Sequence, residues 1–117
     1  MYDTHMHTAP FSTDSSMLIE EVLKTQEERF IGIVLTEHMD FDFPPPDEYH
    51  FHSGDYFKAY QPYRNDTFLL GAEIGMQTHV LNQNIEFVRS HPFDMIIASI
   101  LITRHIKQMG VLSYFLY

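Results

Sequence analysis

The segment Ile31-Gly32-Ile33-Val34-Leu35-Thr36-Glu37-His38 is an apolar run that ends in polar, ionisable residues. Short apolar runs rich in β-branched residues are typical of strands. In α/β barrels the catalytic groups follow the carboxyl ends of buried strands. The segment therefore predicts a buried strand with a candidate functional site directly after it, at Glu37 and His38.

Three further strand-like runs, at residues 1–4, 68–72 and 95–100, join residues 31–36 to make four. Segments of helical pattern separate them. This alternation predicts an α/β fold of about four parallel strands with intervening helices, joined by right-handed crossovers. The loops that follow the strands then gather at one rim, where the chemistry is expected.

The first predicted helix spans residues 16–28, with Ser15 or Ser16 as its N-cap. A shorter second helix is expected around residues 56–60. The third helix carries an apolar stripe made of Val80, Leu81, Ile85 and Val88. Residues 39–53 include three consecutive prolines and predict a long loop.

Composition narrows the class of protein. The chain has 117 residues, of which 44% are hydrophobic, so one domain with a packed core is expected. Its formal charge of −9 disfavours binding to nucleic acid and to anionic membranes. Without cysteine, metal binding must rest on the eight histidines and the carboxylates. The N-terminus resembles no secretion signal, and we expect a cytoplasmic protein that neither enters nor binds a membrane.

Two histidines, His5 and His7, form an H-x-H pattern at the end of the first strand. Side chains alternate along a strand, so both point to one side, together with Asp3, and can bind a single metal ion. Asp3 would ligate weakly or orient a histidine. Chance occurrence in a histidine-rich chain is the alternative.

The segment Gly71-Ala72-Glu73-Ile74-Gly75 closes the third apolar run. Small neighbours leave room around Glu73, whose carboxylate could bridge two metal ions. A helix N-cap or an exposed loop acid is the alternative interpretation of Glu73. The agreement of three ligand sets, at the ends of three successive strands, favours a metal site.

Four motifs together resemble the histidinol phosphatase branch of the polymerase and histidinol phosphatase (PHP) family, over about residues 1–100. They are His5-x-His7-Thr8, Phe11-Ser12-Thr13-Asp14-Ser15, Thr36-Glu37-His38-Met39-Asp40-Phe41-Asp42 and Gly71-Ala72-Glu73-Ile74-Gly75. The resemblance implies a distorted, TIM-like (βα)7 barrel with two or three divalent ions of Zn, Mn or Fe. It also implies a phosphoric monoester hydrolase that converts L-histidinol phosphate to L-histidinol and phosphate in histidine biosynthesis.

Carried over residue by residue, the resemblance implies the metal ligands His5, His7, Asp14, His38 and Glu73. Within this set, Glu73 is the implied bridging carboxylate, and Asp14, His38 and Glu73 are expected to be catalytic. Asp40 and Asp42 would receive the ammonium group of histidinol, or would only solvate the loop.

The resemblance ends after residue 100. The family has a histidine in a Ser-Ile-His context, whereas this chain reads Ser99-Ile100-Leu101. We therefore expect residues 1–117 to hold the N-terminal part of a PHP domain with a divergent tail, 101–117, and weak or no catalysis by this chain alone. His105 lies four residues too late to replace the missing ligand. Residues 95–100 would form an open apolar edge, which the tail covers or through which the chain self-associates.

Two other functions stay open: a PHP phosphoesterase acting on nucleotides or nucleic acid, and a non-catalytic remnant that binds one metal ion or none. Measured turnover would separate them. Among the other histidines, His50 and His52 are expected to be solvated or to face substrate, and His79 and His91 to be surface and cap residues.

Overall fold

The computed structural model of the chain describes residues 1–43, 49–100 and 114–116. Leu101, His105 and the three prolines at 44–46 lie outside the described residues. The predictions made for these residues, the long proline-rich loop and the missing family histidine, therefore concern parts of the chain that the structure does not describe.

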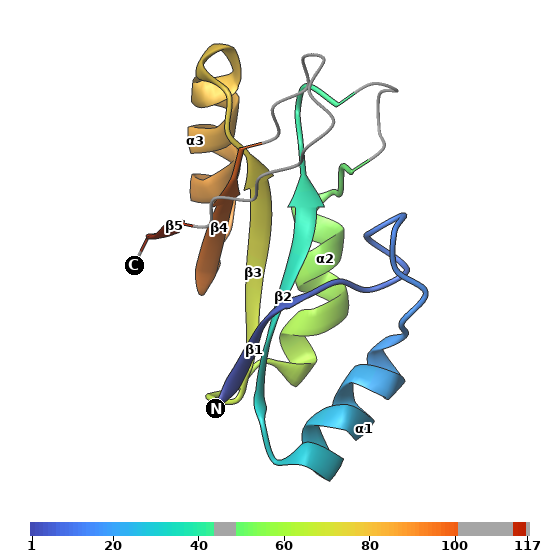
Figure 1. Cartoon of the computed structure of the whole chain (residues 1–117). Helices are drawn as coiled ribbons and strands as arrows, with labels where there is room; N and C mark the ends of the chain where they lie inside the picture. Colours follow the sequence, from blue (N-terminus) through green and yellow to red (C-terminus); the bar gives the residue numbers. More distant parts are fainter. Residues whose placement is uncertain (44–48, 101–113, 117) are drawn as a thin grey trace, which may run out of the picture.

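The strands form a single sheet with the spatial order β1-β2-β3-β4-β5. Its members are β1 (Tyr2–Met6), β2 (Gly32–Met39), β3 (Phe68–Gly75), β4 (Met95–Ser99) and β5 (Tyr114–Leu116). The first four are parallel, and β5 runs antiparallel to β4. Figure 1 shows these strands side by side in a curled, open sheet. The predicted α/β fold with four parallel strands is confirmed.

Three α-helices fill the crossovers between the parallel strands. They are α1 (Ile19–Arg29), α2 (Ser53–Tyr60) and α3 (Leu81–Ser90). Short 3₁₀ turns, Gln61–Tyr63 after α2 and Thr78–Val80 before α3, complete two of the connections. Each helix therefore returns the chain to the start of the next parallel strand, as βαβ units require.

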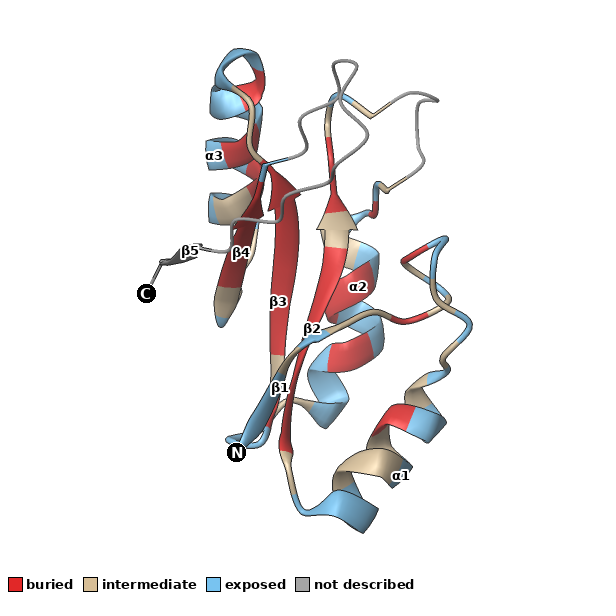
Figure 2. Ribbon diagram, in the orientation of Figure 1, coloured by how far each residue is buried: buried red, intermediate tan, exposed pale blue. Residues whose placement is uncertain are grey.

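One face of the sheet packs against the helices and forms the hydrophobic core. The strands contribute alternate residues such as Leu35 and Leu70, and the helices contribute Val22, Tyr56 and Phe87. Figure 2 shows buried positions along β2, β3 and β4 and on part of each helix, whereas β1 is intermediate or exposed. Because side chains alternate, the residues between these core positions lie on the other face of the sheet.

The start of α1 differs from the prediction. Ser15 and Ser16 do not cap the helix, which begins at Ile19; the Glu21 carboxylate instead accepts a hydrogen bond of 2.8 Å from the Leu18 amide. The Ser15 hydroxyl is engaged elsewhere, donating to the backbone carbonyl of His7 over 2.9 Å. Ser15 thus ties the loop to the end of β1 rather than opening the helix.

The apolar stripe predicted for α3 is wrong in part. Leu81 and Ile85 are 45% and 39% exposed, and the buried residues of the helix are Asn84 and Phe87. The Asn84 amide donates a hydrogen bond of 3.0 Å to the carbonyl of Gly75, at the end of β3. This bond and the packing of Phe87 in the core set the rotation of the helix, and they outweigh the burial of two aliphatic side chains.

The edge at β4 is not fully open. Ile96, Ile97 and Ala98 pair with Leu116, Phe115 and Tyr114 of β5. The prediction of an unpaired fourth strand is therefore wrong at these residues, and the alternative, in which the tail folds back, holds for them. Self-association of the chain remains a prediction.

Within the described ranges, no helix has the length and apolar character needed to span a bilayer.

We predict that Gly71→Ala will destabilise the fold. A Cβ atom at Gly71 would lie 2.6 Å from the Met95 carbonyl oxygen and 3.1 Å from that of Leu35, and backbone atoms on both sides cannot give way. Overpacking of this kind costs about 1–3 kcal/mol. Thermal and urea unfolding would measure the loss.

Gly54→Ala is the matched control. A Cβ there meets only the His52 side chain, at 3.0 Å, and Gly54 lies within α2, where alanine is favoured by about 0.5–1 kcal/mol. We expect its free energy of unfolding to equal or slightly exceed that of the wild type. Equal stabilities for the two variants would contradict the packing argument for Gly71.

Candidate metal centre

Three neighbouring strands bring ionisable side chains to the same rim of the sheet. His5 lies near the end of β1, His38 near the end of β2 and Glu73 near the end of β3. His38 and Glu73 are direct cross-strand partners in the parallel register. Both belong to the face of the sheet opposite the core, because they alternate with core positions. The predicted convergence on one rim is what the structure shows.

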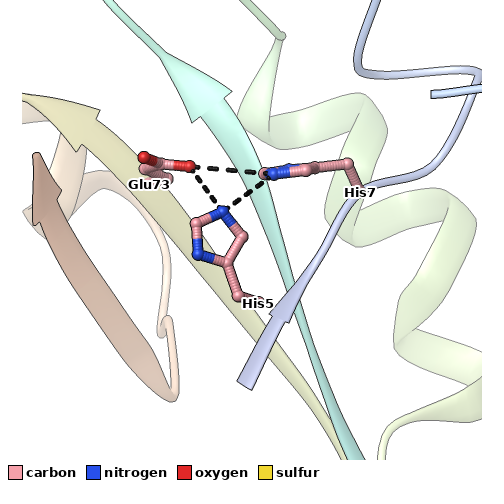
Figure 3. Close-up of side chains that lie close together, drawn as sticks. All are labelled: His5, His7 and Glu73. Atoms are coloured by element: carbon pink, nitrogen blue, oxygen red, sulfur yellow. Dashed lines mark hydrogen bonds and ion pairs between the residues drawn. The ribbon is translucent and has the colours of Figure 1, made fainter. Parts of the chain in front are cut away.

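His5, His7 and Glu73 form the first cluster, which Figure 3 shows with the two imidazole rings pointing toward the carboxylate. The Glu73 Oε2 atom lies 3.0 Å from Nε2 of His5 and 3.7 Å from Nε2 of His7. The two Nε2 atoms are 3.0 Å apart. Glu73 is 6% exposed, so its carboxylate faces the rings from a buried position.

His7, Asp14 and His38 form a second cluster that shares His7 with the first. Nε2 of His38 lies 3.0 Å from Oδ2 of Asp14, and its Nδ1 lies 3.3 Å from Oε2 of Glu73. The rings of His7 and His38 are stacked, with centroids 4.2 Å apart and planes 15° from parallel. His38 therefore links the two clusters through both of its ring nitrogens.

The donor atoms of these clusters fit a divalent metal ion. Oε2 of Glu73 is buried, and within the described part of the chain it makes no well-aligned hydrogen bond. Each cluster brings two histidines and one carboxylate together, with their ligand atoms within 4.8 Å of one another. Nitrogen and oxygen ligands of this kind suit zinc and related ions. Buried groups that lack hydrogen bonds are costly, and ligation would relieve that cost.

The electrostatics of the cluster favour neutral imidazole at its centre. Burial lowers the pKa of His7, and the neighbouring His38 lowers it further, while Asp14 and Glu73 act in the opposite direction. A lower pKa keeps the ring deprotonated near neutral pH, which is the form that ligates metals.

Glu37 does not join His38 at the rim. It is fully buried on the opposite side of β2, where its carboxylate accepts hydrogen bonds of 2.5 Å from the hydroxyls of Thr8 and Ser12. The Thr8 amide adds contacts of 3.0 and 3.1 Å to the two carboxylate oxygens. Burial raises the pKa of Glu37, and the hydrogen bonds from Ser12 and Thr8 pull it back down.

Asp40 and Asp42 follow His38 in the chain but belong to neither cluster. Asp40 is buried, and its Oδ1 atom accepts a hydrogen bond of 3.1 Å from the Asp42 amide. Its carboxylate packs against Gly75, where a Cβ atom would come within 2.7 Å of it. Oδ2 of Asp42 lies 2.9 Å from Nε2 of His79, and both side chains are largely exposed.

The remaining histidines stand apart from the clusters. Nδ1 of His52 accepts a hydrogen bond of 3.3 Å from the Asp55 amide at the start of α2. The ring of His50 contacts Phe41 edge-on, and that of His91, the C-cap of α3, stacks on Phe57.

Asp3 is exposed, and its Oδ1 atom accepts a hydrogen bond of 3.3 Å from the amide of His5. Asp3 therefore shapes the end of β1 and is not part of either cluster.

The importance of Thr8, Ser12 and Tyr60 does not follow from their sequence patterns. Thr8 and Ser12 belong to the motifs that carry the resemblance, which implies no role for either, and the sequence places Tyr60 only within the second predicted helix. A weak signal exists: two small hydroxyl residues flank a loop that separates the H-x-H pattern from Asp14. Their common partner, Glu37, is distant in the chain and is identified only by the fold.

Comparison with known proteins agrees with this geometry. The model of the PHP domain family matches residues 3–114. The chain is 43% identical over 100 residues to the probable histidinol-phosphatase of Clostridium acetobutylicum, a match that covers 86% of this chain and 39% of that protein.

A solved structure is similar in fold as well as in sequence. It is the crystal structure of histidinol phosphate phosphatase from Lactococcus lactis subsp. lactis, complexed with zinc, L-histidinol and phosphate. The TM-score is 0.73 with 30% sequence identity, and the match covers 85% of this chain and 39% of that one. The chain thus spans about two fifths of the length of both relatives. Since the family model matches nearly all of its residues, the chain belongs to the PHP domain family.

Proposed function

We propose that this chain supplies a metal-binding part of a PHP phosphomonoesterase that acts on L-histidinol phosphate. The observation that carries the proposal is the pair of clusters joined at His7, His38 and Glu73, with all donor atoms at one rim of a parallel sheet. The similar Lactococcus protein was solved with zinc, L-histidinol and phosphate, which supports the metal and the substrate class.

In this proposal, the five clustered residues hold divalent ions. His5, His7 and Glu73 would hold one ion, and His7, Asp14 and His38 would hold a second, with Glu73 as the carboxylate ligand common to both. Zinc, manganese and iron suit such a mixed nitrogen and oxygen set. Ions at such a site supply the Lewis acidity that neutralises charge on the phosphoryl oxygens.

The protein residues contribute binding and orientation. Glu73 is buried against β4 and β2, so its carboxylate has little freedom to move. His38 is held between Asp14 and Glu73. The rings of His38 and Tyr49 meet in a T-shaped contact, with their centroids 4.9 Å apart. Groups fixed in this way do not need to reorganise when charge develops on the substrate.

The substrate ammonium is assigned to Asp42 in this proposal. Asp40 is buried and engaged with the backbone, so it is suited to holding the loop after β2. Asp42 lies at the surface, where its partner His79 is also exposed. A cationic group of a ligand can compete with His79 for the Asp42 carboxylate at modest cost, because exposed ion pairs are weak.

Two alternatives are kept for testing. A nucleic acid substrate is disfavoured by the net charge of −9, which repels a polyphosphate backbone. A non-catalytic remnant would bind metal through the same clusters without turnover. Metal binding and turnover must therefore be measured separately.

We predict that Glu73→Gln will weaken Zn²⁺ binding by more than about tenfold, because an amide cannot supply the buried anionic ligand of the first cluster, which also lies 3.3 Å from Nδ1 of His38 in the second. Isothermal titration calorimetry with the metal-free chain would measure the affinity. His52→Ala is the matched control, since His52 is exposed and lies outside the clusters. If the Glu73 variant bound zinc as tightly as the wild type, Glu73 would not be a ligand.

We also predict slow, metal-dependent release of phosphate from L-histidinol phosphate, abolished by Glu73→Gln. Slow turnover is expected because the 117 residues correspond to about two fifths of the related enzymes. Phosphate release with added Zn²⁺ or Mn²⁺ would be compared with release from a nucleoside monophosphate. Tight metal binding without hydrolysis of any ester would favour the non-catalytic alternative, and faster release from the nucleotide would favour another PHP phosphoesterase.

A further inference from the structure

Glu37 is a buried acid that the proposed chemistry does not use. It is 0% exposed, yet it lies next in sequence to His38, one of the clustered residues. Successive side chains of a strand point to opposite faces, so His38 faces the clusters while Glu37 faces the loop between β1 and α1. Both oxygens of its carboxylate accept hydrogen bonds from that loop, donated by Thr8 and Ser12.

The two residues that Glu37 holds lie between the clustered residues His7 and Asp14. Thr8 directly follows His7, and Ser12 precedes Asp14 by two positions. Thr8 and Ser12 are 0% and 3% exposed, so these hydrogen bonds are shielded from water. Buried hydrogen bonds to a carboxylate are among the stronger ones in proteins.

Tyr60 completes the arrangement from α2. Its hydroxyl lies 2.8 Å from Oγ1 of Thr8. Because the Thr8 hydroxyl already donates to Glu37, Tyr60 acts as donor to Thr8. Burial raises the pKa of Tyr60, which keeps this hydroxyl protonated. The loop is thereby tied to both β2 and α2.

We propose that Glu37 is a positioning residue for the metal centre: through Thr8 and Ser12 it fixes His7 and Asp14 at the distances from His38 that metal binding requires. This inference rests on the proposed function, because it assumes that the clusters bind metal. His38 and Glu73 sit on paired strands and are placed by the sheet. Asp14 lies in the loop, and His7 lies just beyond the end of β1, so both depend on a further anchor.

A Co²⁺ titration followed by visible absorption tests this, since the spectrum reports the geometry of the ligands as well as the affinity. Glu37→Leu removes all the acceptors at similar volume, and we expect cobalt binding to weaken by about tenfold or more, with an altered spectrum. Glu37→Gln keeps one acceptor for Thr8, and the Ser12 hydroxyl can accept from its amide. We expect this conservative variant to recover most of the affinity.

Asp94→Leu is the matched control for loss of stability alone. The Asp94 carboxylate also accepts several hydrogen bonds, from Arg64 and from the Leu70 amide, but it precedes β4 at the opposite rim. We expect it to lower the melting temperature of the metal-free chain and to leave the cobalt affinity and spectrum unchanged. If Glu37 had a purely structural role, Glu37→Leu would likewise lower the melting temperature and leave the cobalt affinity and spectrum unchanged.

Ser12→Ala keeps the test decisive if Glu37→Leu does not fold. It removes only one donor to Glu37, and we expect a smaller loss of cobalt affinity in a folded chain. The loss should not add to that of Glu37→Gln in the double variant, because both act on one interaction. Wild-type affinity and spectrum in the Glu37 and Ser12 variants would overturn this inference while leaving the proposed function intact. A wild-type chain that binds no cobalt would overturn both.

Discussion

The parallel pairing of β2 with β3 is the constraint on which the site depends. Seven consecutive residue pairs, from Ile33 with Phe68 to Met39 with Ile74, fix the register of the two strands. That register sets His38 beside Glu73, and a slip by one residue would turn one of them toward the hydrophobic core. Gly71 contributes by its lack of a side chain, since backbone carbonyls of both neighbouring strands approach it closely.

The two faces of β2 separate the polar functions of the chain. His38 lies on the face of the clusters, and Glu37 lies among the helices, where a charged group would be costly without partners. Thr8 and Ser12 compensate that cost, and in doing so they bind the β1–α1 loop to the strand. Tyr56 acts similarly for the sheet, with its buried hydroxyl donating to the Gly71 carbonyl over 3.1 Å. Polar groups in this core thus organise the backbone that surrounds the site.

The metal centre concentrates groups that are unfavourable when left alone. The Nε2 atoms of His5 and His7 lie 3.0 Å apart, which requires a proton or a cation between them, and Glu73 adds a buried carboxylate oxygen that lacks a well-aligned hydrogen bond. A cation resolves both problems at once. Under the proposed function, the acidic balance of the chain is compatible with a phosphorylated substrate, because bound cations would supply the charge that attracts it.

The sequence by itself determined the parallel α/β order, the rim at which the clustered side chains gather and the family, because strand periodicity and the residues at strand ends are local properties of the chain. It did not determine that Glu37 and His38 serve different faces in different roles, that Ser15 ties down a loop, or that α3 buries Asn84 in place of Leu81. Those outcomes depend on partners in other elements, such as Thr8 after β1 for Glu37 and Gly75 at the end of β3 for Asn84. Hydrogen bonds across such separations exist only after register and crossover geometry are set, and they then override the local apolar pattern.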